Sequence, residues 1–210
     1  MKTSGARIRV LVVDDHPVVR VGITTIVDTQ PDMTVVGETG SGEDAIALFE
    51  ELRPDLTIMD LRLESMSGVD CIRRIRGEHK DARFVVLTTY RGDEDIHQAM
   101  EAGACGYLIK GMSRQFLLDA IRRVHRGERF LPPPVAETLA SRKPDAELSV
   151  REHEVLAMLA KGKSNKEIAA ALNVAEITVK CHLSMIFLRL GVTDRTQAII
   201  AAAQRGLIHL

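Results

Sequence analysis

The chain has 210 residues, 45% of them hydrophobic, which is enough for one large core or two modest ones. It lacks an apolar run near the about 20 residues that span a bilayer and lacks a signal-peptide pattern, so we expect a soluble, cytoplasmic protein without membrane contact. Residues 1–125 hold 16 Lys and Arg against 20 Asp and Glu, a net charge of −4, whereas residues 148–210 hold 8 against 5, a net charge of +3. An acidic module followed by a mildly basic one that can approach a polyanion is therefore predicted. The cysteines, Cys71, Cys105 and Cys181, have no metal-type spacing, which disfavours a disulfide framework or a zinc site.

Short apolar runs alternate with helix-like segments from Arg7 to about His125. These runs, which we predict as strands, lie near residues 8–13, 33–38, 55–60, 83–88 and 105–109. Strands that alternate with helices form a parallel sheet through right-handed crossovers, with helices on both faces. The first half is therefore predicted to be an α/β domain. The Gly40, Ser41 and Gly42 turn lacks the full glycine spacing of a phosphate loop, so Ser41 is predicted to cap a helix.

Polar side chains follow four of the predicted strands. They are Asp14 and Asp15, Asp60, Thr88 and Lys110. The carboxyl ends of parallel strands share one edge of the sheet, where such sheets bind their ligands. Converging carboxylates favour a hard cation such as Mg²⁺, while an amine and a hydroxyl can hold the oxygens of a transferred phosphoryl group. Asp60 on the central strand is then the predicted nucleophile, although any single acid at a strand end can merely cap a helix or face water.

Four segments resemble the receiver domain of two-component response regulators over residues 7–126. They are residues 10–16 (VLVVDDH), 58–61 (IMDL) with Gly68, 86–88 (VLT) and 103–110 (GACGYLIK). The resemblance implies a flavodoxin-like (βα)5 fold in which a sensor histidine kinase phosphorylates Asp60. It also implies Mg²⁺ bound by Asp14, Asp15, Asp60 and the backbone carbonyl of Arg62, switch residues Thr88 and Tyr107, and Lys110 on the phosphoryl group. Leu63 and Glu64 replace the usual Met-Pro pair, so we expect a more mobile and more negative loop there.

The pattern changes after His125. Gly127 and three consecutive prolines from Pro132 predict a linker over residues 127–147 with one short helix, between domains at residues 1–126 and 148–210. The last segment has no convincing strand and is predicted as four helices. Ser149 and Ser164 each begin a capping box that opens a helix.

The third of these helices is predicted from about Ala175 to Leu190, where Gly191 ends it. We expect it to bury Ile177, Leu183, Ile186, Phe187 and Leu190. A capped helix, a short break and a longer helix match a helix-turn-helix, whose second helix enters the DNA major groove. Thr178, Lys180, His182 and Ser184 are the candidates for the groove face, and a plain helical bundle with a solvated charged face is the alternative.

Residues 148–152, 164–169, 178–182 and 191–195 resemble the LuxR-type output domain, and with the receiver they are similar to the NarL/FixJ class. The resemblance implies that the bases are contacted by Lys180, Cys181 and Ser184, and the phosphates by Ser164, Asn165, Lys166, Thr178 and His182. The helix from Arg195 would serve dimerisation. Met185 and Leu188 are less polar than is usual in the family, and we expect them to contribute to a protein interface.

These observations predict a transcription factor controlled by phosphorylation, which acts as a homodimer on double-stranded promoter DNA and has RNA polymerase as a further partner. No turnover is expected beyond loss of its own phosphoryl group. One alternative is a phosphatase with Asp60 as nucleophile, but Arg62 stands where such enzymes place a second aspartate. Another is a regulator that acts through protein contacts without DNA.

Overall fold

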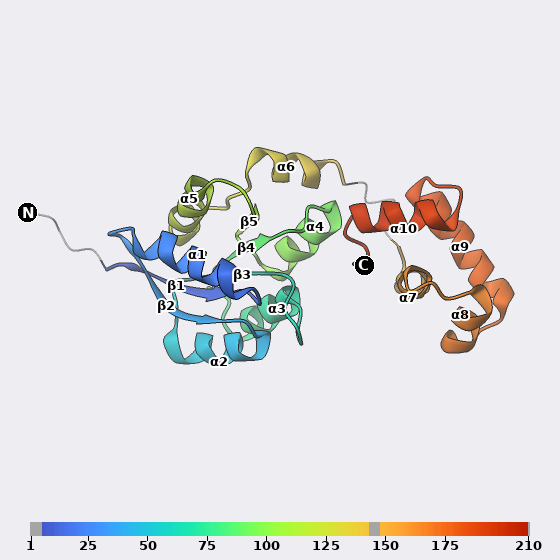
Figure 1. Ribbon diagram of the computed structural model, residues 1–210, viewed down its shortest axis with the longest axis horizontal. Coiled ribbons are helices and arrows are strands. Elements are labelled where there is room, and N and C mark those ends of the chain that lie inside the picture. The colour runs from blue at the N-terminus through green and yellow to red at the C-terminus, as the bar shows by residue number, and fades with distance from the viewer. Residues whose placement is uncertain (1–5, 143–147, 210) are drawn as a thin grey trace, which may run out of the picture. The chain divides into compact units, whose positions relative to one another are not determined.

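The computed structural model describes residues 6–142 and 148–209, and the chain divides into two compact units (Figure 1). The first unit comprises Met1–Tyr90 and Ile96–Ala136, and the second comprises Glu137–Leu210 together with Arg91–Asp95. The first is built on a β-sheet, and the second contains helices and no strand in its described part.

The first unit contains a five-stranded parallel sheet in the order β2-β1-β3-β4-β5. The strands are β1 (Ile8–Val13), β2 (Met33–Thr39), β3 (Leu56–Met59), β4 (Phe84–Thr88) and β5 (Gly106–Ile109). All residues of β3, β4 and β5 are buried, as expected of apolar strands that are covered on both faces. The predicted α/β class and the predicted strands are confirmed.

Helices cover both faces of this sheet (Figure 1). The helices are α1 (Pro17–Asp28), α2 (Gly42–Leu52), α3 (Gly68–Glu78), α4 (Asp93–Ala102) and α5 (Arg114–His125). Ile23 of α1 and Ile121 of α5 join one core with Val12 and Ile58 of the sheet. On the opposite face, Phe49 of α2 stacks on Phe84 of β4, with 6.3 Å between the ring centroids.

The turn before α2 behaves as its sequence predicts. The Ser41 hydroxyl accepts a hydrogen bond from the Asp44 backbone N–H at 3.3 Å, which satisfies one of the free amides at the start of the helix. The interpretation of this glycine-containing turn as a helix cap is confirmed.

The second unit contains helices α7 (Val150–Ala160), α8 (Asn165–Leu172), α9 (Glu176–Leu190) and α10 (Arg195–Gln204). Both predicted capping boxes are present, formed by Ser149 with Glu152 and by Ser164 with Glu167. Asn173 and Gly191, both in the left-handed conformation, end α8 and α9, and the end at Gly191 is where the sequence predicts it. Helix α6 (Pro133–Ala140) lies within the predicted linker, of which residues 143–147 lie outside the described residues.

One predicted core position in α9 is wrong. Ile177 is 66% exposed, whereas Val179, Leu183 and Ile186 are buried. Residues four and seven positions apart share a helix face, so the buried set starts at Val179 and leaves Ile177 on the opposite side. Phe187 and Leu190 are partly buried against the same core.

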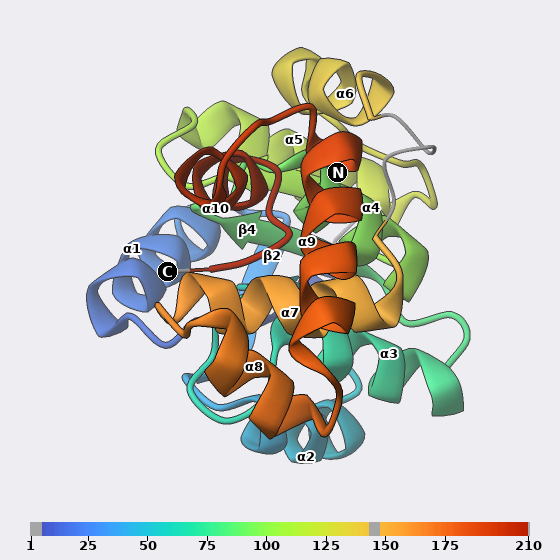
Figure 2. The same cartoon turned by 90° about the vertical axis from the view of Figure 1, so that its right-hand side faces the viewer.

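Helices α8 and α9 are bent by 108° relative to each other, and Figure 2 shows the short turn that joins them. Within the described residues no single helix is long and apolar enough to cross a membrane. These two helices meet that length and hydrophobicity only when they are combined across their bend. An angle in this range is typical of a helix-turn-helix.

Candidate functional site

The strand register of the first unit brings the predicted acidic residues together. Val13 pairs with Met59, so the next residues, Asp14 and Asp60, leave adjacent strands at the same edge. The Asp60 N–H donates to the Val13 carbonyl at 2.8 Å, which fixes this arrangement. Asp14 is 1% exposed and Asp60 is 3% exposed, so both carboxyl groups lie in a largely dry pocket.

Lys110 enters the pocket from the other side. Thr88 pairs with Ile109, and Lys110 directly follows that pair. The Lys110 ammonium lies 2.7 Å from Asp14 Oδ2 and 2.5 Å from Asp60 Oδ2. Burial by itself would lower the pKa of Lys110, but hydrogen bonds to both carboxylates and their negative charges raise it above the usual value. The amine therefore stays charged and balances part of the negative charge of the pocket.

Carboxylate oxygens gather in a group that fits a cation. Asp14, Asp15, His16 and Asp60 each offer one ligand atom, and these atoms all lie within 4.8 Å of one another. The backbone N–H of Arg62 faces Asp60 Oδ1 at 3.4 Å, which places the start of the β3–α3 loop beside the group. Oxygen ligands of this kind suit Mg²⁺, so the donor set fits the predicted ion.

The two predicted switch residues differ in their hydrogen bonds. Thr88 is fully buried, and among the described residues its hydroxyl has no hydrogen-bond partner. An unsatisfied buried hydroxyl is costly unless a ligand supplies a partner. Tyr107 is also fully buried, and its hydroxyl donates to the Tyr90 carbonyl at 3.2 Å. Thr88 thus has hydrogen-bonding capacity left for an incoming group.

The β3–α3 loop is anchored by apolar and polar contacts. The Leu63 side chain is buried, and the Ser65 hydroxyl donates to Glu43 at the start of α2. A Cβ on Gly68 would lie 2.0 Å from the Asp60 carbonyl oxygen, so the loop returns very close to the acidic residue. The higher mobility expected from Leu63 and Glu64 stays a prediction, but Leu63 itself is a buried anchor.

Two residues at the pocket were missed by the sequence analysis. His16 Nδ1 contacts Asp15 Oδ1 and lies 3.4 Å from Asp14 Oδ1. Arg20 donates to the Asp14 backbone carbonyl at 2.7 Å. His16 directly follows Asp14 and Asp15 in the sequence, and this position could have identified it as a pocket residue. Arg20 has no such signal, because it reaches the pocket only through the fold of α1.

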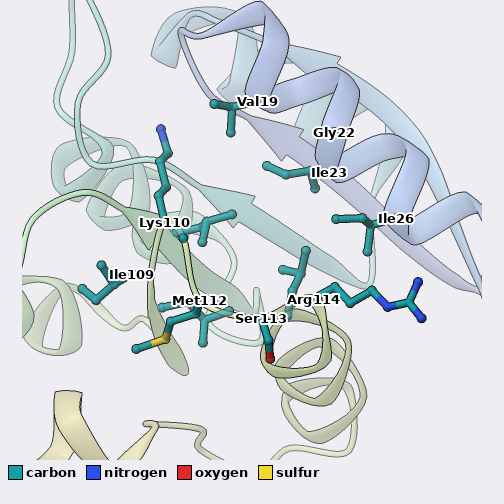
Figure 3. Close-up of a pocket in the computed structure, with 13 residues that line it drawn as sticks. Val19, Gly22, Ile23, Ile26, Ile109, Lys110, Met112, Ser113 and Arg114 are labelled. Carbon is teal, nitrogen blue, oxygen red and sulfur yellow. The ribbon is translucent and has the colours of Figure 1, made fainter.

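An apolar cavity of about 290 Å³ is lined by α1 and by the loop that carries Lys110. Figure 3 shows Val19, Ile23 and Ile26 projecting from α1 toward this loop, which also carries Met112. Lys110 therefore takes part in the lining of this cavity while its amine pairs with the acidic residues.

Exposed residues of α9 form one stripe along the helix. They are Glu176, Ile177, Lys180, Cys181, Ser184, Met185 and Leu188. Their spacing of three and four residues places them on a single face. Lys180 makes an ion pair with Glu176 at 3.1 Å, and the Ser184 hydroxyl donates to the Lys180 carbonyl at 3.0 Å.

The other predicted DNA contacts lie on the same two helices. Thr178 and His182 are partly buried in α9, while Ser164, Asn165 and Lys166 lie at the start of α8, with only Asn165 of these partly buried. The Ser164 hydroxyl also donates to Glu167 at 2.6 Å, so it already takes part in the helix cap. The structure thus gives every predicted DNA contact at least partial exposure, and it adds Ile177 to the exposed face.

A (βα)5 sheet with an acidic edge and an opposing lysine, joined to a helix-turn-helix unit, defines a receiver domain with a DNA-binding output. The comparisons with known proteins give the same class. The response regulator receiver domain matches residues 10–122, and the bacterial regulatory proteins of the luxR family match residues 146–202. The chain belongs to the two-component response regulators of the NarL/FixJ class.

Relatives are similar over nearly the whole chain. The response regulator protein VraR of Staphylococcus aureus (strain Mu3 / ATCC 700698) is 43% identical over 207 residues, covering 96% of this chain and 99% of VraR. The crystal structure of ChrA, from a heme-sensing two-component system, is 40% identical with a TM-score of 0.58, covering 97% of this chain and 100% of ChrA. The RcsB chain of an RcsB–DNA complex is 25% identical with a TM-score of 0.70, covering 94% of this chain and 98% of the RcsB chain.

Proposed function

We propose that a sensor histidine kinase phosphorylates Asp60 and that this modification controls homodimerisation and promoter binding. The observation that carries the proposal is the pairing of the buried Asp60 with Lys110 beside the unpartnered Thr88 hydroxyl. One Asp60 oxygen forms the new O–P bond as the N–P bond of the donor phosphohistidine breaks, and the histidine keeps the bonding electron pair. The charged Lys110 amine and the Thr88 hydroxyl then hold oxygens of the phosphoryl group.

The proposed cofactor is Mg²⁺. Asp14, Asp15, Asp60 and the backbone carbonyl of Arg62 would hold it, and their clustered oxygens support this assignment. The ion supplies charge neutralisation to the phosphoryl oxygens. Arg20 holds the turn of Asp14 and Asp15 in place, because its guanidinium donates a hydrogen bond to the Asp14 carbonyl.

The proposed switch runs through Thr88 and Tyr107. Once Thr88 binds the phosphoryl group, we expect the buried Tyr107 ring and its bond to the Tyr90 carbonyl to adjust, because Thr88 and Tyr107 lie on the paired strands β4 and β5. A modification that favours one of two arrangements shifts their populations. The favoured arrangement is the one in which two copies pair on DNA.

The proposed DNA contacts fall into two classes. Bases are read by Lys180, Cys181 and Ser184, and phosphates are bound by Ser164, Asn165, Lys166, Thr178 and His182. The exposed stripe of α9 and the 108° bend from α8 support this assignment. Helix α10 would serve dimerisation, with the cytoplasm as the location and RNA polymerase as a further partner.

We also propose that residues 1–126 are the receiver domain, residues 127–147 the linker and residues 148–210 the output domain. No turnover beyond loss of the protein's own phosphoryl group is expected. A phosphatase of this kind would need a second aspartate two positions after Asp60 as general acid, and Arg62 occupies that position. Hydrolysis of small phosphate esters that depends on Asp60 would favour the phosphatase instead.

The test is DNA binding to the protein's own promoter region, with and without Mg²⁺ and a small phosphodonor. Wild type and the exposed-residue control Asp81→Ala should bind more tightly after phosphodonor treatment, whereas Asp60→Ala should not respond. Binding that is equal in all conditions would overturn control by Asp60. Tightening that persists in Asp60→Ala would place the acceptor elsewhere.

A further inference from the structure

Ile177 is an apolar side chain on the face of α9 that points away from the core of its unit. It is the second residue of the helix and is 66% exposed. Cys181 and Leu188, four and eleven residues further along, are exposed on the same line of the helix. This line lies opposite the buried face that starts at Val179. The core therefore gives no reason for an isoleucine at this position.

The hydrogen-bonding groups beside Ile177 are already engaged with one another. The Lys180 amine pairs with Glu176 at 3.1 Å, and the Ser184 hydroxyl donates to the Lys180 carbonyl at 3.0 Å. Ile177 itself has no polar side-chain atom, and the Cys181 thiol is only a weak donor. Covering such a surface gains free energy only from an apolar group on the partner.

The position of Ile177 along α9 separates it from Leu188. Eleven residues at about 1.5 Å each put the two side chains about 16 Å apart along the helix axis. In a helix-turn-helix the residues near the start of the second helix reach the base edges. Ile177 lies in that part of α9, whereas Leu188 lies near the other end and stays available for a protein interface.

Charge indicates that the partner of Ile177 is DNA. Lys180 is exposed one turn further along the same face, and Lys166 is exposed at the start of α8. Amines on both helices suit a polyanion, and they would be a costly border for an apolar protein partner. Figure 2 shows α8 and α9 joined by their short turn, so these side chains belong to one helix-turn-helix surface.

We propose that Ile177 is a specificity-determining residue, which packs against the C5 methyl group of thymine in the major groove. This methyl group is the apolar feature that distinguishes the base pairs there. A β-branched side chain has few rotamers, so its contact with the methyl group orders little. Each half-site of the operator then carries an A·T pair opposite the start of α9. This inference rests on the DNA contacts of the proposed function.

The experiment compares two duplexes of the protein's own promoter region, one with thymine and one with 2′-deoxyuridine at every thymidine position. Uracil pairs with adenine as thymine does but lacks the methyl group. Binding of the full-length, phosphodonor-treated protein is measured by fluorescence anisotropy. One buried methyl group changes affinity by about fourfold, and a homodimer meets two half-sites, so wild type should bind the uracil duplex about tenfold more weakly.

Three variants assign this preference to one side chain. Ile177→Ala should bind the thymine duplex more weakly and should lower the affinity ratio between the duplexes to about threefold or less. Ile177→Val keeps a branched apolar side chain and should keep most of the ratio. Val150→Ala, at an 80% exposed valine of α7, is the control and should keep the wild-type ratio. Any effect of uracil on DNA shape is common to all four proteins.

Two further readouts complete the test. Because Ile177 is exposed, Ile177→Ala should unfold at the same urea concentration as wild type, which shows that the fold is kept. Replacing thymines by uracil one at a time should reveal one position in each half-site that weakens wild type and leaves Ile177→Ala unchanged.

The outcomes separate this inference from the proposed function. If wild type binds both duplexes equally, or if Ile177→Ala keeps the full preference for thymine, the inference is overturned and DNA binding stands. If wild type binds neither duplex, the assignment of α9 to the major groove falls, and the inference falls with it.

Discussion

The Lys110 ammonium lies 2.5 Å from Asp60 Oδ2, across the edge between the third and fifth strands of the sheet. The same amine lies 2.7 Å from Asp14 Oδ2. One cation therefore serves two buried carboxylates that would otherwise repel each other. The stability of the metal-free receiver should depend on this residue.

Lys110→Met should destabilise the metal-free protein by about 3 kcal/mol or more, because it leaves buried carboxylates without their cation. Mg²⁺ should restore part of this loss, since it can replace the missing charge. Urea unfolding with and without MgCl₂ measures both effects. Lys80→Met, at an exposed position, is the control, and an equal response of the two variants would contradict the role of Lys110.

The contribution of Lys110 also has a defined pH dependence. Because folding raises the pKa of the amine above its ordinary value of 10.5, the stabilisation is fully present below that pH. It is lost as the pH rises through the folded-state pKa. The stability difference between wild type and Lys110→Met should therefore be flat around neutral pH and shrink only in strong alkali.

Two glycines of α3 should respond oppositely to alanine. A Cβ on Gly68 would lie 2.0 Å from the Asp60 carbonyl oxygen, so Gly68→Ala must displace the loop and should weaken Mg²⁺ binding and phosphorylation. Gly77 lies inside the same helix with nothing within 4 Å of its Cβ position. Gly77→Ala should stabilise the protein by about 0.5–1 kcal/mol. Calorimetric Mg²⁺ titration measures the first effect, and urea unfolding measures the second. Equal Mg²⁺ affinity and equal stability of the two variants would contradict the expected difference.

Glu152 links the first and third helices of the output domain. Its Oε2 accepts hydrogen bonds from the Ser149 N–H at 2.7 Å and from Arg189 at 2.5 Å. Burial alone would raise the pKa of this carboxyl, but the Ser149 hydrogen bonds and the Arg189 charge lower it below 4.5. Its stabilisation is therefore present above pH 4.5 and is lost as the pH falls through the folded-state pKa.

Glu152→Gln should cost about 3 kcal/mol at pH 7, because Arg189 loses its buried carboxylate partner. The cost should shrink in acid, as the pH falls below 4.5 and through the lowered folded-state pKa, because the wild-type carboxyl then also becomes protonated. Chemical unfolding followed by far-UV circular dichroism at pH 7 and over a series of falling pH values measures the difference. Glu154→Gln, in a more exposed pair with Arg151, is the control, and a cost for Glu152→Gln that does not change with pH would disprove the linkage.

Lys180 should contribute directly to DNA affinity. Its exposed amine pairs with Glu176 at 3.1 Å, and this solvated pair can be exchanged for a base or phosphate at little cost. Lys180→Ala should weaken operator binding by about 1–3 kcal/mol. Fluorescence anisotropy over a salt series measures this. Unchanged affinity would remove Lys180 from the groove face, and a loss with a reduced salt slope would identify a phosphate contact.

Leu188 offers a test of the expected protein interface. It is 73% exposed and is the last residue of the exposed stripe of α9. If it joins a protein interface, Leu188→Ser should shift the phosphorylated protein toward monomer in analytical ultracentrifugation. Val150→Ser, at an 80% exposed valine of another helix, is the control. Identical sedimentation of Leu188→Ser and wild type would end that hypothesis.

Local signals explain why much of the fold was predictable. Strands buried on both faces leave continuous apolar runs, and polar residues directly after them mark the edge where ligands bind. The capping boxes at Ser149 and Ser164 are equally local, because a hydroxyl and a glutamate three residues apart satisfy the same amides. These features need no knowledge of distant contacts.

Other features depend on packing between distant segments. Ile177 is apolar, as core residues usually are. Which face of α9 is buried, however, is decided by the packing of Val179, Leu183 and Ile186 against the other helices. The burial of Leu63 and the reach of Arg20 to the Asp14 carbonyl likewise depend on how loops and helices fold back. No local pattern could have supplied those contacts.

The residues at the sheet edge come from four strands, and Asp14 and Lys110 are far apart in sequence. Contacts between distant segments form late in folding and vanish with any partial opening of the sheet. Fragments that lack either Asp14 or Lys110 should therefore be chemically inert toward phosphodonors, even when they contain Asp60. A cell that produces copies truncated within the receiver would accumulate protein that cannot receive the signal, so the phosphorylated population reports only molecules with a complete, folded receiver.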